Sequence, residues 1–340
     1  MDFMNIIKSL DKIHIYPEKN YRLKIGVSIK NIKDIKSNNN EYNDEYTDKF
    51  LIEKINCLAK IYLPSDIYYA WFQKSNYCNN YSIILLSKEK IRVSNESQLQ
   101  FLYEWCKTEN VVLLLKTEVK TEVKTEANND ISEKYISENK YIENKYYNFT
   151  WMSSPQSFIQ INKNAELWIH DIVSRWYLTK SNLFYGLGGQ MGIYSKYFTS
   201  VHDCKQNKET QNKETQNKET QNKQNTYINL TDSESIYNDC INNGQTNTFL
   251  INYNNVQLKK YFTDSNSTLL INISKNGLKD LANDVLMLKC QQIIYIACSD
   301  ISINRDLKIL CPTYKIENME KIDQFPNTKS FSYIINLLLN

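Results

Sequence analysis

Glycine is scarce in this sequence, and the placement of the few glycines constrains the fold more than any other feature. Seven of the 340 residues are glycine, whereas average usage is about 7%. Four of the seven, Gly186, Gly188, Gly189 and Gly192, fall within one short segment. Such a cluster is typical of backbone that needs positive φ or a very close approach to another group. The surrounding residues, SNLFYGLGGQMGIYSKYF, predict a strand, a glycine loop and the start of a helix.

This arrangement of strand, loop and helix has two explanations. It can bring backbone N–H groups against a nucleotide-like ligand. It can also be a tight turn that binds nothing. The spacing differs from the dinucleotide fingerprint, and no Lys-Ser or Lys-Thr pair follows to make a phosphate-binding loop. The window alone therefore leaves both explanations open.

The charge balance and the apolar runs exclude several classes of protein. Lys and Arg total 41 against 38 Asp and Glu, so a net charge of +3 allows a nucleic-acid surface only as a local patch. The apolar runs are far shorter than the ~20 residues of a membrane span, and the first residues lack the layout of a signal peptide. Eight Cys and three His form no CxxC pair or His-Cys cluster. We therefore expect an intracellular protein, cytoplasmic or nuclear, with reduced thiols and no metal site.

The length predicts about two domains at about 150 residues each, and local composition places their boundaries. Residues 1–116 mix short strands with helical stretches and predict an α+β domain. Residues 117–146 contain tandem KTEV repeats and a charged stretch, which predict a solvated linker or insertion. Residues 147–340 predict an α/β sheet with helices on both faces, interrupted by a disordered insertion over 205–226, where QNKET repeats. Strands are predicted at 21–29, 81–86, 111–116, 183–185, 248–253, 268–273 and 292–298, and helices at 48–61, 97–106, 164–177, 233–242 and 279–289.

One cysteine has a position that the others lack. On an open α/β sheet, ligands bind beyond the carboxyl ends of the strands, where Gly186, Asn272 and Cys298 are expected to emerge. Cys298 follows the apolar run IIYIA and would face the same crevice as the glycine loop. A cysteine on a strand is more often a small buried apolar residue than a nucleophile. Both roles stay open at this point.

Five windows after residue 150 resemble motifs that occur together, in the same order, in one enzyme family. They are SPQSFIQIN (154–162) for SFxQxN, FYGLGGQMG (184–192) for LYCGxGxF, INISKNGL (271–278) for DPPRxGL, IIYIACSDISINRDLKIL (293–310) for YxSCNPxTxxRDLxxL, and IDQFPNTKSF (322–331) for DQFPxTxH. Nearer the start, YRLK (21–24) resembles a YRxK/R segment. On these motifs the chain is similar to the RNA 5-methyluridine methyltransferases, the family of tRNA (uracil-5-)-methyltransferases. The resemblance covers most of 150–340 and only one short motif of 1–115.

The resemblance implies a fold, a methyl donor and an acceptor. It implies a Rossmann-like class I methyltransferase domain with an N-terminal accessory domain, S-adenosylmethionine as donor, and a uridine in RNA as acceptor, foremost in the T-loop of a tRNA. Uridine C5 is a poor nucleophile, so the family adds a cysteine thiolate to C6 and later removes the C5 proton with a base. Cys298 matches that nucleophile. We expect a monomer that binds tRNA or another structured RNA.

The resemblance also implies individual contacts. Contacts with the methyl donor are implied for Gln160, Tyr185, Gly186, Gly188, Gly189, Gln190 and Asn272, and for an acidic residue that falls near Asp203 or Lys205. RNA contacts are expected for Arg22, Lys24, Lys275 and Lys329. Arg305 is expected either beside them or in an internal ion pair that holds the loop after Cys298.

The departures from the family pattern concern carboxylates. Asn272 stands where the DPPR motif has aspartate, and Lys275 stands at its arginine. Ser332 aligns with the glutamate that removes the C5 proton, and a hydroxyl is a far weaker base than a carboxylate. Asp300 or Asp323 are candidates to replace it. The sequence therefore leaves two functions open, an active methyltransferase with relocated proton chemistry and an inactive relative that binds or folds tRNA.

Overall fold

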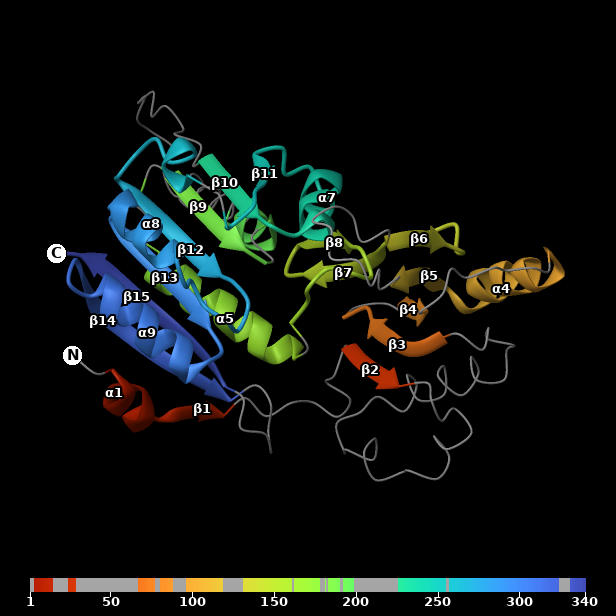
Figure 1. Cartoon of the computed structure of the whole chain (residues 1–340), viewed down its shortest axis with the longest axis horizontal. Helices are drawn as coiled ribbons and strands as arrows, with labels where there is room; N and C mark the ends of the chain where they lie inside the picture. The colour runs from red at the N-terminus through yellow and green to blue at the C-terminus, as the bar shows by residue number, and fades with distance from the viewer. Residues whose placement is uncertain are drawn as a thin grey trace, which may run out of the picture. The chain divides into compact units, whose positions relative to one another are not determined.

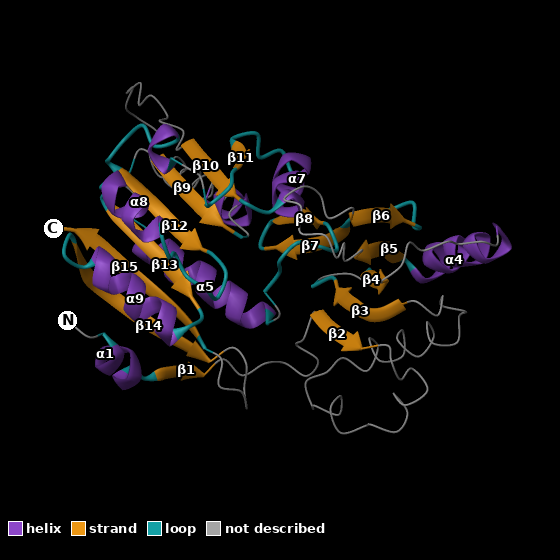
Figure 2. Cartoon of the chain, in the orientation of Figure 1, coloured by secondary structure: helices purple, strands orange, loops and turns teal. Residues whose placement is uncertain are grey.

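The computed structural model describes two compact units. The small unit is residues 17–163, and the large unit combines residues 1–16 with 164–340. Figures 1 and 2 show the helices and strands of both. The described residues are 3–14, 24–28, 67–76, 80–87, 96–118, 131–160, 162–177, 181, 183–189, 192–198, 226–254, 257–323 and 331–340.

Eight strands among the described residues of the large unit form one sheet (Figure 1). In spatial order they are β1 (Lys12–His14), β14 (Tyr314–Asp323), β15 (Ser332–Leu339), β13 (Gln292–Ala297), β12 (Ser267–Asn272), β9 (Leu183–Gly188), β10 (Thr226–Thr231) and β11 (Thr248–Leu250). β15 is antiparallel to both neighbours, and the other pairs are parallel. The chain adds β10 and β11 on one side of β9 and then β12 and β13 on the other. Open α/β sheets bind ligands at such a reversal of strand order.

Helices cover both faces of this sheet, as its apolar central strands require. All of β13 and nearly all of β12 are buried, which is typical of parallel strands covered on both sides. One face carries α1 (Met4–Ser9), η2 (Leu258–Lys260), α8 (Leu281–Leu288) and α9 (Asp300–Leu310), whereas α5 (Lys163–Trp176) lies behind the sheet in Figure 2. Phe184 faces that second side and packs against Phe198 from the helical residues 192–198. α7 (Glu234–Asn242) packs against β10 and β11.

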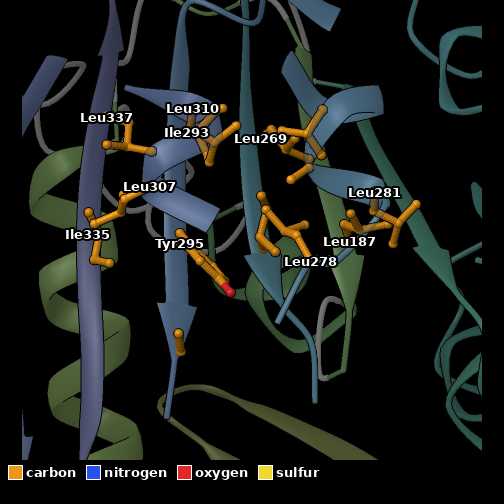
Figure 3. Packing of buried hydrophobic residues seen from close by; sticks show 14 of the residues in the cluster. Leu187, Leu269, Leu278, Leu281, Ile293, Tyr295, Leu307, Leu310, Ile335 and Leu337 are labelled. Atoms are coloured by element: carbon orange, nitrogen blue, oxygen red, sulfur yellow. The ribbon is translucent and has the colours of Figure 1, made fainter. Parts of the chain in front are cut away.

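The core under α8 and α9 is continuous from β9 to β15. Leu187, Ile293 and Leu337 project from three strands toward Leu281 and Leu307 of the two helices (Figure 3). Each fully buried side chain of this size contributes roughly 1.5–3 kcal/mol to folding. The sheet order and the two helical layers confirm the Rossmann-like α/β fold that the sequence predicts.

The first residues fold differently from the prediction. Residues 1–16 are predicted to lie in the N-terminal domain, but they belong to the large unit. β1 pairs in parallel with β14, and the backbone N–H of Phe3 donates to Asn304 Oδ1 of α9 (3.0 Å). Phe3 and Ile7 are buried in the core. The physical reason is that β14 would otherwise expose an unpaired edge, and α1 offers an apolar side to α9.

The small unit is an α+β structure. Its described strands form a five-stranded sheet, β2 (Lys24–Ser28), β3 (Ile67–Lys74), β4 (Tyr81–Ser87), β5 (Val111–Glu118) and β6 (Ile131–Tyr135), and a hairpin of β7 (Ile142–Tyr146) and β8 (Phe149–Ser153). α4 (Glu96–Glu109) joins β4 to β5, and this pair is parallel because a helix supplies the crossover. Leu102 and Cys106, one helical turn apart, form the buried side of α4.

Part of the predicted linker is folded. The sequence analysis treats 117–146 as solvated, but β5 runs to Glu118 and both β6 and β7 lie within this range. Ile136, Ile142 and Tyr146 are buried, so a few apolar side chains spaced among the charges are enough to fix the strands. Residues 119–130 lie outside the described part.

Other predicted segments also fall outside it. These are the helix at 48–61 and the insertion at 205–226, apart from Thr226 at the start of β10. Within the ranges that the structure describes, no helix has both the length and the apolar character to cross a membrane.

Candidate active site

The carboxyl edge of the large sheet gathers the predicted nucleophile, glycine loop and base position. β9, β12 and β13 are parallel neighbours, so they end side by side. Cys298 follows β13 directly and is exposed to solvent. β15 starts at the same edge, because it is antiparallel to β13 and pairs Tyr333 with Ala297. Cys298 follows Ala297 and Ser332 precedes Tyr333, so the same register places Cys298 opposite Ser332.

The close approach that requires glycine at position 188 comes from the chain itself. Gly188 has φ +112°, and a Cβ there would overlap the carbonyl of Asn272 and lie 2.9 Å from Ile273 Cγ2. The N–H of Gly189 donates to the Asn272 carbonyl oxygen (2.8 Å), and Asn272 Nδ2 donates to the Gly189 carbonyl oxygen (3.3 Å). The ends of β9 and β12 are thus joined at the point where the strand order reverses.

A carboxylate that the sequence analysis missed lies at this edge. Asp232 directly follows β10, the strand beside β9, and its side chain is exposed. Partial burial raises the pKa of the Asp232 carboxyl. Asp203, the predicted acidic residue, lies outside the described residues. The alternating run TYINLT before Asp232 is the signal that could have located the strand and its terminal acid.

The loop after β12 is fastened to α9. Gly277 has φ +69°, and a Cβ there would overlap the Asp306 carboxylate and lie 2.8 Å from Ser302 Cβ. The N–H of Leu278 donates to Asp306 Oδ2 (2.8 Å), and Ser302 Oγ donates to the Lys275 carbonyl oxygen (2.7 Å). These contacts hold the segment that carries Lys275 against the first turns of α9.

Asp306 is the centre of this fastening. It is fully buried, and its Oδ2 also accepts a hydrogen bond from the Tyr295 hydroxyl (2.8 Å). Arg305 Nη2 lies 2.7 Å from Asp306 Oδ1 and donates to the Asn276 carbonyl oxygen (2.8 Å). Of its two expected roles, Arg305 therefore takes the internal ion pair, and the loop it holds is the one after β12.

The electrostatic surroundings of Cys298 differ from those of the other described cysteines. Partial desolvation raises the pKa of the Cys298 thiol, and the positive charge of Lys275 lowers that pKa in part. The other described cysteines are less accessible. Burial is the main cause that raises the pKa of Cys290 and Cys311 to about 11 and that of Cys106 and Cys240 to about 12. Within the described residues, Cys298 is thus the exposed thiol with a neighbouring cation.

The candidates for proton transfer have different surroundings. Ser332 is 3% exposed at the start of β15, so its hydroxyl is nearly enclosed. Asp300 lies in the first turn of α9 and is half-buried, and its Oδ1 accepts a hydrogen bond from the Tyr333 hydroxyl (2.6 Å). Asp323 ends β14 and is half-buried.

Two positions of the predicted cofactor loop lie inside the strand. β9 extends to Gly188, so Gly186 is paired on both sides, with Asn229 of β10 and Leu270 of β12. Tyr185 is fully buried, its ring stacks on Phe262 (centroids 3.9 Å apart), and its hydroxyl accepts from the Thr263 N–H (2.9 Å). The resemblance implies a contact of Tyr185 with the methyl donor, whereas its side chain lies in the core of the large unit.

The remaining predicted positions lie in the small unit, beside this edge or outside the described residues. Gln160 belongs to the small unit, in the segment after β8, and is 6% exposed. Lys24 begins β2 of the same unit. Lys275 is exposed beside the edge. Arg22, Gln190, Asp203 and Lys329 lie outside the described residues.

Comparison with known proteins now assigns the family. The profile of the tRNA (uracil-5-)-methyltransferase family matches residues 53–338, which is most of the chain. The chain belongs to the tRNA (uracil-5-)-methyltransferase family. Its fold agrees with a solved member at 13% identity, the Pyrococcus abyssi tRNA (uracil-54, C5)-methyltransferase in complex with S-adenosyl-L-homocysteine. That likeness has a TM-score of 0.65 and covers 97% of this chain and 79% of the other.

Curated relatives match over a shorter stretch. An uncharacterized RNA methyltransferase of Bacillus anthracis is 28% identical over 72 residues, 21% of this chain and 16% of its own length. A 23S rRNA (uracil(1939)-C(5))-methyltransferase of Haemophilus influenzae is 36% identical over 61 residues, 18% of this chain and 14% of its own length. The matched stretches thus span only a small part of these relatives.

Proposed function

We propose that this member of the tRNA (uracil-5-)-methyltransferase family transfers a methyl group from S-adenosylmethionine to C5 of a uridine in RNA, with Cys298 as nucleophile. The observation that most directly supports this proposal is the exposed thiol of Cys298 at the carboxyl edge, next to the reversal of strand order. We take the T-loop of a tRNA as first target, because the family and the solved relative are named for tRNA.

The residues at the edge fit the methyl donor. The donor is a nucleoside with a charged amino acid part, and it supplies an electrophilic methyl group. The Asp232 carboxylate can accept hydrogen bonds from ribose hydroxyls, as an acidic residue does in related nucleotide-binding sheets. Asn272 offers an amide whose oxygen accepts no hydrogen bond from another described residue. Gly188 and Gly189 leave the end of β9 without side chains.

The chemistry follows from the weakness of uridine C5 as a nucleophile. The Cys298 sulfur bonds to C6, and the electron pair of the C5–C6 double bond moves onto the O4 carbonyl. The resulting enolate carries electron density back to C5, which bonds to the methyl group as the bond between that methyl and the donor's sulfonium sulfur breaks and leaves its electron pair on the sulfur. A base then takes the C5 proton, the double bond reforms, and the Cys298 thiolate leaves.

We assign the removal of the C5 proton to the Asp300 carboxylate. Ser332 stands at the family's base position, but a nearly enclosed hydroxyl is a far weaker proton acceptor than a carboxylate. Asp300 supplies a carboxylate two residues after Cys298, and Tyr333, the neighbour of Ser332, fixes it by a hydrogen bond. The base is thereby relocated from β15 to the first turn of α9.

A substrate analogue tests the nucleophile. A T-loop stem with 5-fluorouridine lacks the C5 proton, so methylation should stop at a covalent protein–RNA adduct. Incubation with S-adenosylmethionine should give this adduct by mass spectrometry in the natural chain and in Cys311→Ala, and none in Cys298→Ala. Absence of the adduct from the natural chain would reject the nucleophile.

The same experiment tests the base, because only natural uridine needs proton removal. Asp300→Asn should still form the 5-fluorouridine adduct, while its turnover to 5-methyluridine falls by about 10²- to 10⁴-fold. Equal turnover in Asp300→Asn and the natural chain would contradict the assignment.

An inactive relative that binds or folds tRNA is the second candidate. It is favoured by Ser332, which removes the family's carboxylate from the edge. It predicts tRNA binding by the natural chain with no 5-methyluridine formed. Nucleoside analysis of tRNA from cells with and without the protein separates the two candidates.

A further inference from the structure

We propose that Lys275 is a positioning residue for Cys298: the contacts between its loop and α9 hold its ammonium group where it stabilises the anionic sulfur. This inference rests on the proposed function only in taking Cys298 as the reacting group. The stabilised form arises when the thiol loses its proton to solvent, which is the form that attacks C6.

The backbone of Lys275 is fixed in a way that an ordinary surface lysine is not. Its carbonyl oxygen accepts from Ser302 Oγ, in the first turn of the helix that begins two residues after Cys298. The next two residues are held as well, since Asn276 accepts from Arg305, and Gly277 fits against α9 only because it lacks a Cβ. Exposed lysines usually sample many positions, so this fastening limits where the side chain begins.

The loop is held through a buried carboxylate, that of Asp306. Asp306 forms an ion pair with Arg305 and accepts hydrogen bonds from the Leu278 N–H and the Tyr295 hydroxyl. This set neutralises Asp306 and leaves the charge of Lys275 outside the network. Breaking a buried charge pair is costly, so the loop is held by a strong local contact.

Among the described residues, two other titratable groups near Cys298 form hydrogen bonds with groups other than its sulfur. From β13, the Tyr295 phenol is electrostatically coupled to Cys298 but donates to Asp306. From α9, Asp300 accepts from Tyr333 of β15. Lys275 is the cation whose charge lowers the pKa of the Cys298 thiol, against the larger effect of desolvation.

The rate of thiol alkylation against pH tests the proposal without RNA. Iodoacetamide reacts with the thiolate, forming a sulfur–carbon bond and releasing iodide, so the rate on the Cys298 peptide follows the thiolate fraction. Near neutral pH, Lys275→Gln should lower this rate by about threefold or more. Lys275→Arg should restore it, because the positive charge is kept.

Two further variants separate the charge from the loop. Lys279→Gln removes an exposed positive charge four residues further along, and its profile should coincide with that of the natural chain. Ser302→Ala removes one bond to the loop and should lower the rate by less than Lys275→Gln. Salt at about 1 M should shrink the difference between Lys275→Gln and the natural chain, since it screens exposed charges.

Coincident profiles for Lys275→Gln and the natural chain, or failure of Lys275→Arg to restore the rate, would overturn the proposal. Failure here is distinguishable from failure of the proposed function. Coincident profiles together with a normal 5-fluorouridine adduct remove only the role of Lys275. A shifted profile without any adduct keeps that role and removes the methyl transfer.

Discussion

At the scale of single residues, His170 makes the stability of the large unit depend on pH. It lies in α5, fully buried, with its ring against Tyr194 (centroids 4.5 Å apart) and Tyr197 (5.6 Å). Desolvation lowers the pKa of His170 from 6.5 to about 3. The unfolded chain therefore binds a proton below about pH 6.5 that the folded chain rejects until about pH 3.

This pKa sets the direction of a stability change. The contribution of neutral His170 to the free energy of unfolding is fully present above pH 6.5. It decreases by about 1.4 kcal/mol per pH unit as the pH falls from 6.5 toward 3. Between pH 7 and pH 5, the natural chain should lose about 2 kcal/mol more of its free energy of unfolding than His170→Phe does. Urea unfolding at both pH values measures this difference.

A matched control for this prediction is Ile169→Val, a buried neighbour that does not titrate. It should lower stability equally at pH 7 and pH 5. An equal loss on acidification in His170→Phe and the natural chain would contradict the prediction.

Residue positions were predictable where strand geometry decides them. The ends of parallel strands meet at one edge, so Asn272 and Cys298 could be placed there from the sequence. Tyr185 lies in β9 within the predicted strand, but its burial in the core was not predicted, because the family motif indicates a donor contact and says nothing of which face of the sheet the ring takes. Asp232 was missed because no strand was predicted between the polar repeat and α7.

At the scale of elements, the loop after β12 depends on α9. Asp306→Asn keeps an acceptor for the Leu278 N–H but removes the charge that Arg305 faces. The free energy of unfolding should fall by about 1–3 kcal/mol, since a buried group loses part of its hydrogen bonding. Hydrogen exchange should show faster exchange at the amide of Leu278 than in the natural chain.

The control for this change is Lys308→Gln, an exposed position on the same helix. Its stability and the exchange at Leu278 should match the natural chain. If Asp306→Asn also matched it, the loop would be held by other contacts.

Elements with a regular apolar pattern were predictable, and those held by a few contacts were not. α5, α7 and α8 and strands β4, β12 and β13 coincide closely with predicted segments, whereas β9 runs three residues beyond its predicted end. β6 and β7 were taken for linker, because charged residues are spread through both strands while few apolar side chains, Ile136 after β6 and Ile142 and Tyr146 in β7, are buried. β1 was predicted in neither unit, since its partner β14 lies almost the whole chain away.

At the scale of the whole molecule, α1 and β1 belong to the large unit, so the stability of that unit should depend on residues 1–16. Phe3→Ala removes a buried ring from the core of the large unit and should cost about 3–5 kcal/mol. Hydrogen exchange should therefore speed up at β13 while β4 of the small unit is unchanged. Ile6→Ala, at an exposed position of the same helix, should leave both unchanged. Faster exchange at β4 instead would tie these residues to the small unit.

The pairing of β1 with β14 also has a consequence for synthesis on the ribosome. Lys12 meets Lys321 in this pair, so β1 acquires its neighbour only after the chain as far as residue 321 has emerged. Domains tend to form as units while the chain is still growing. The small unit, which lies between these two strands in the sequence, can thus fold before β1 and β14 pair, and the large sheet closes between residues that are synthesised far apart in time.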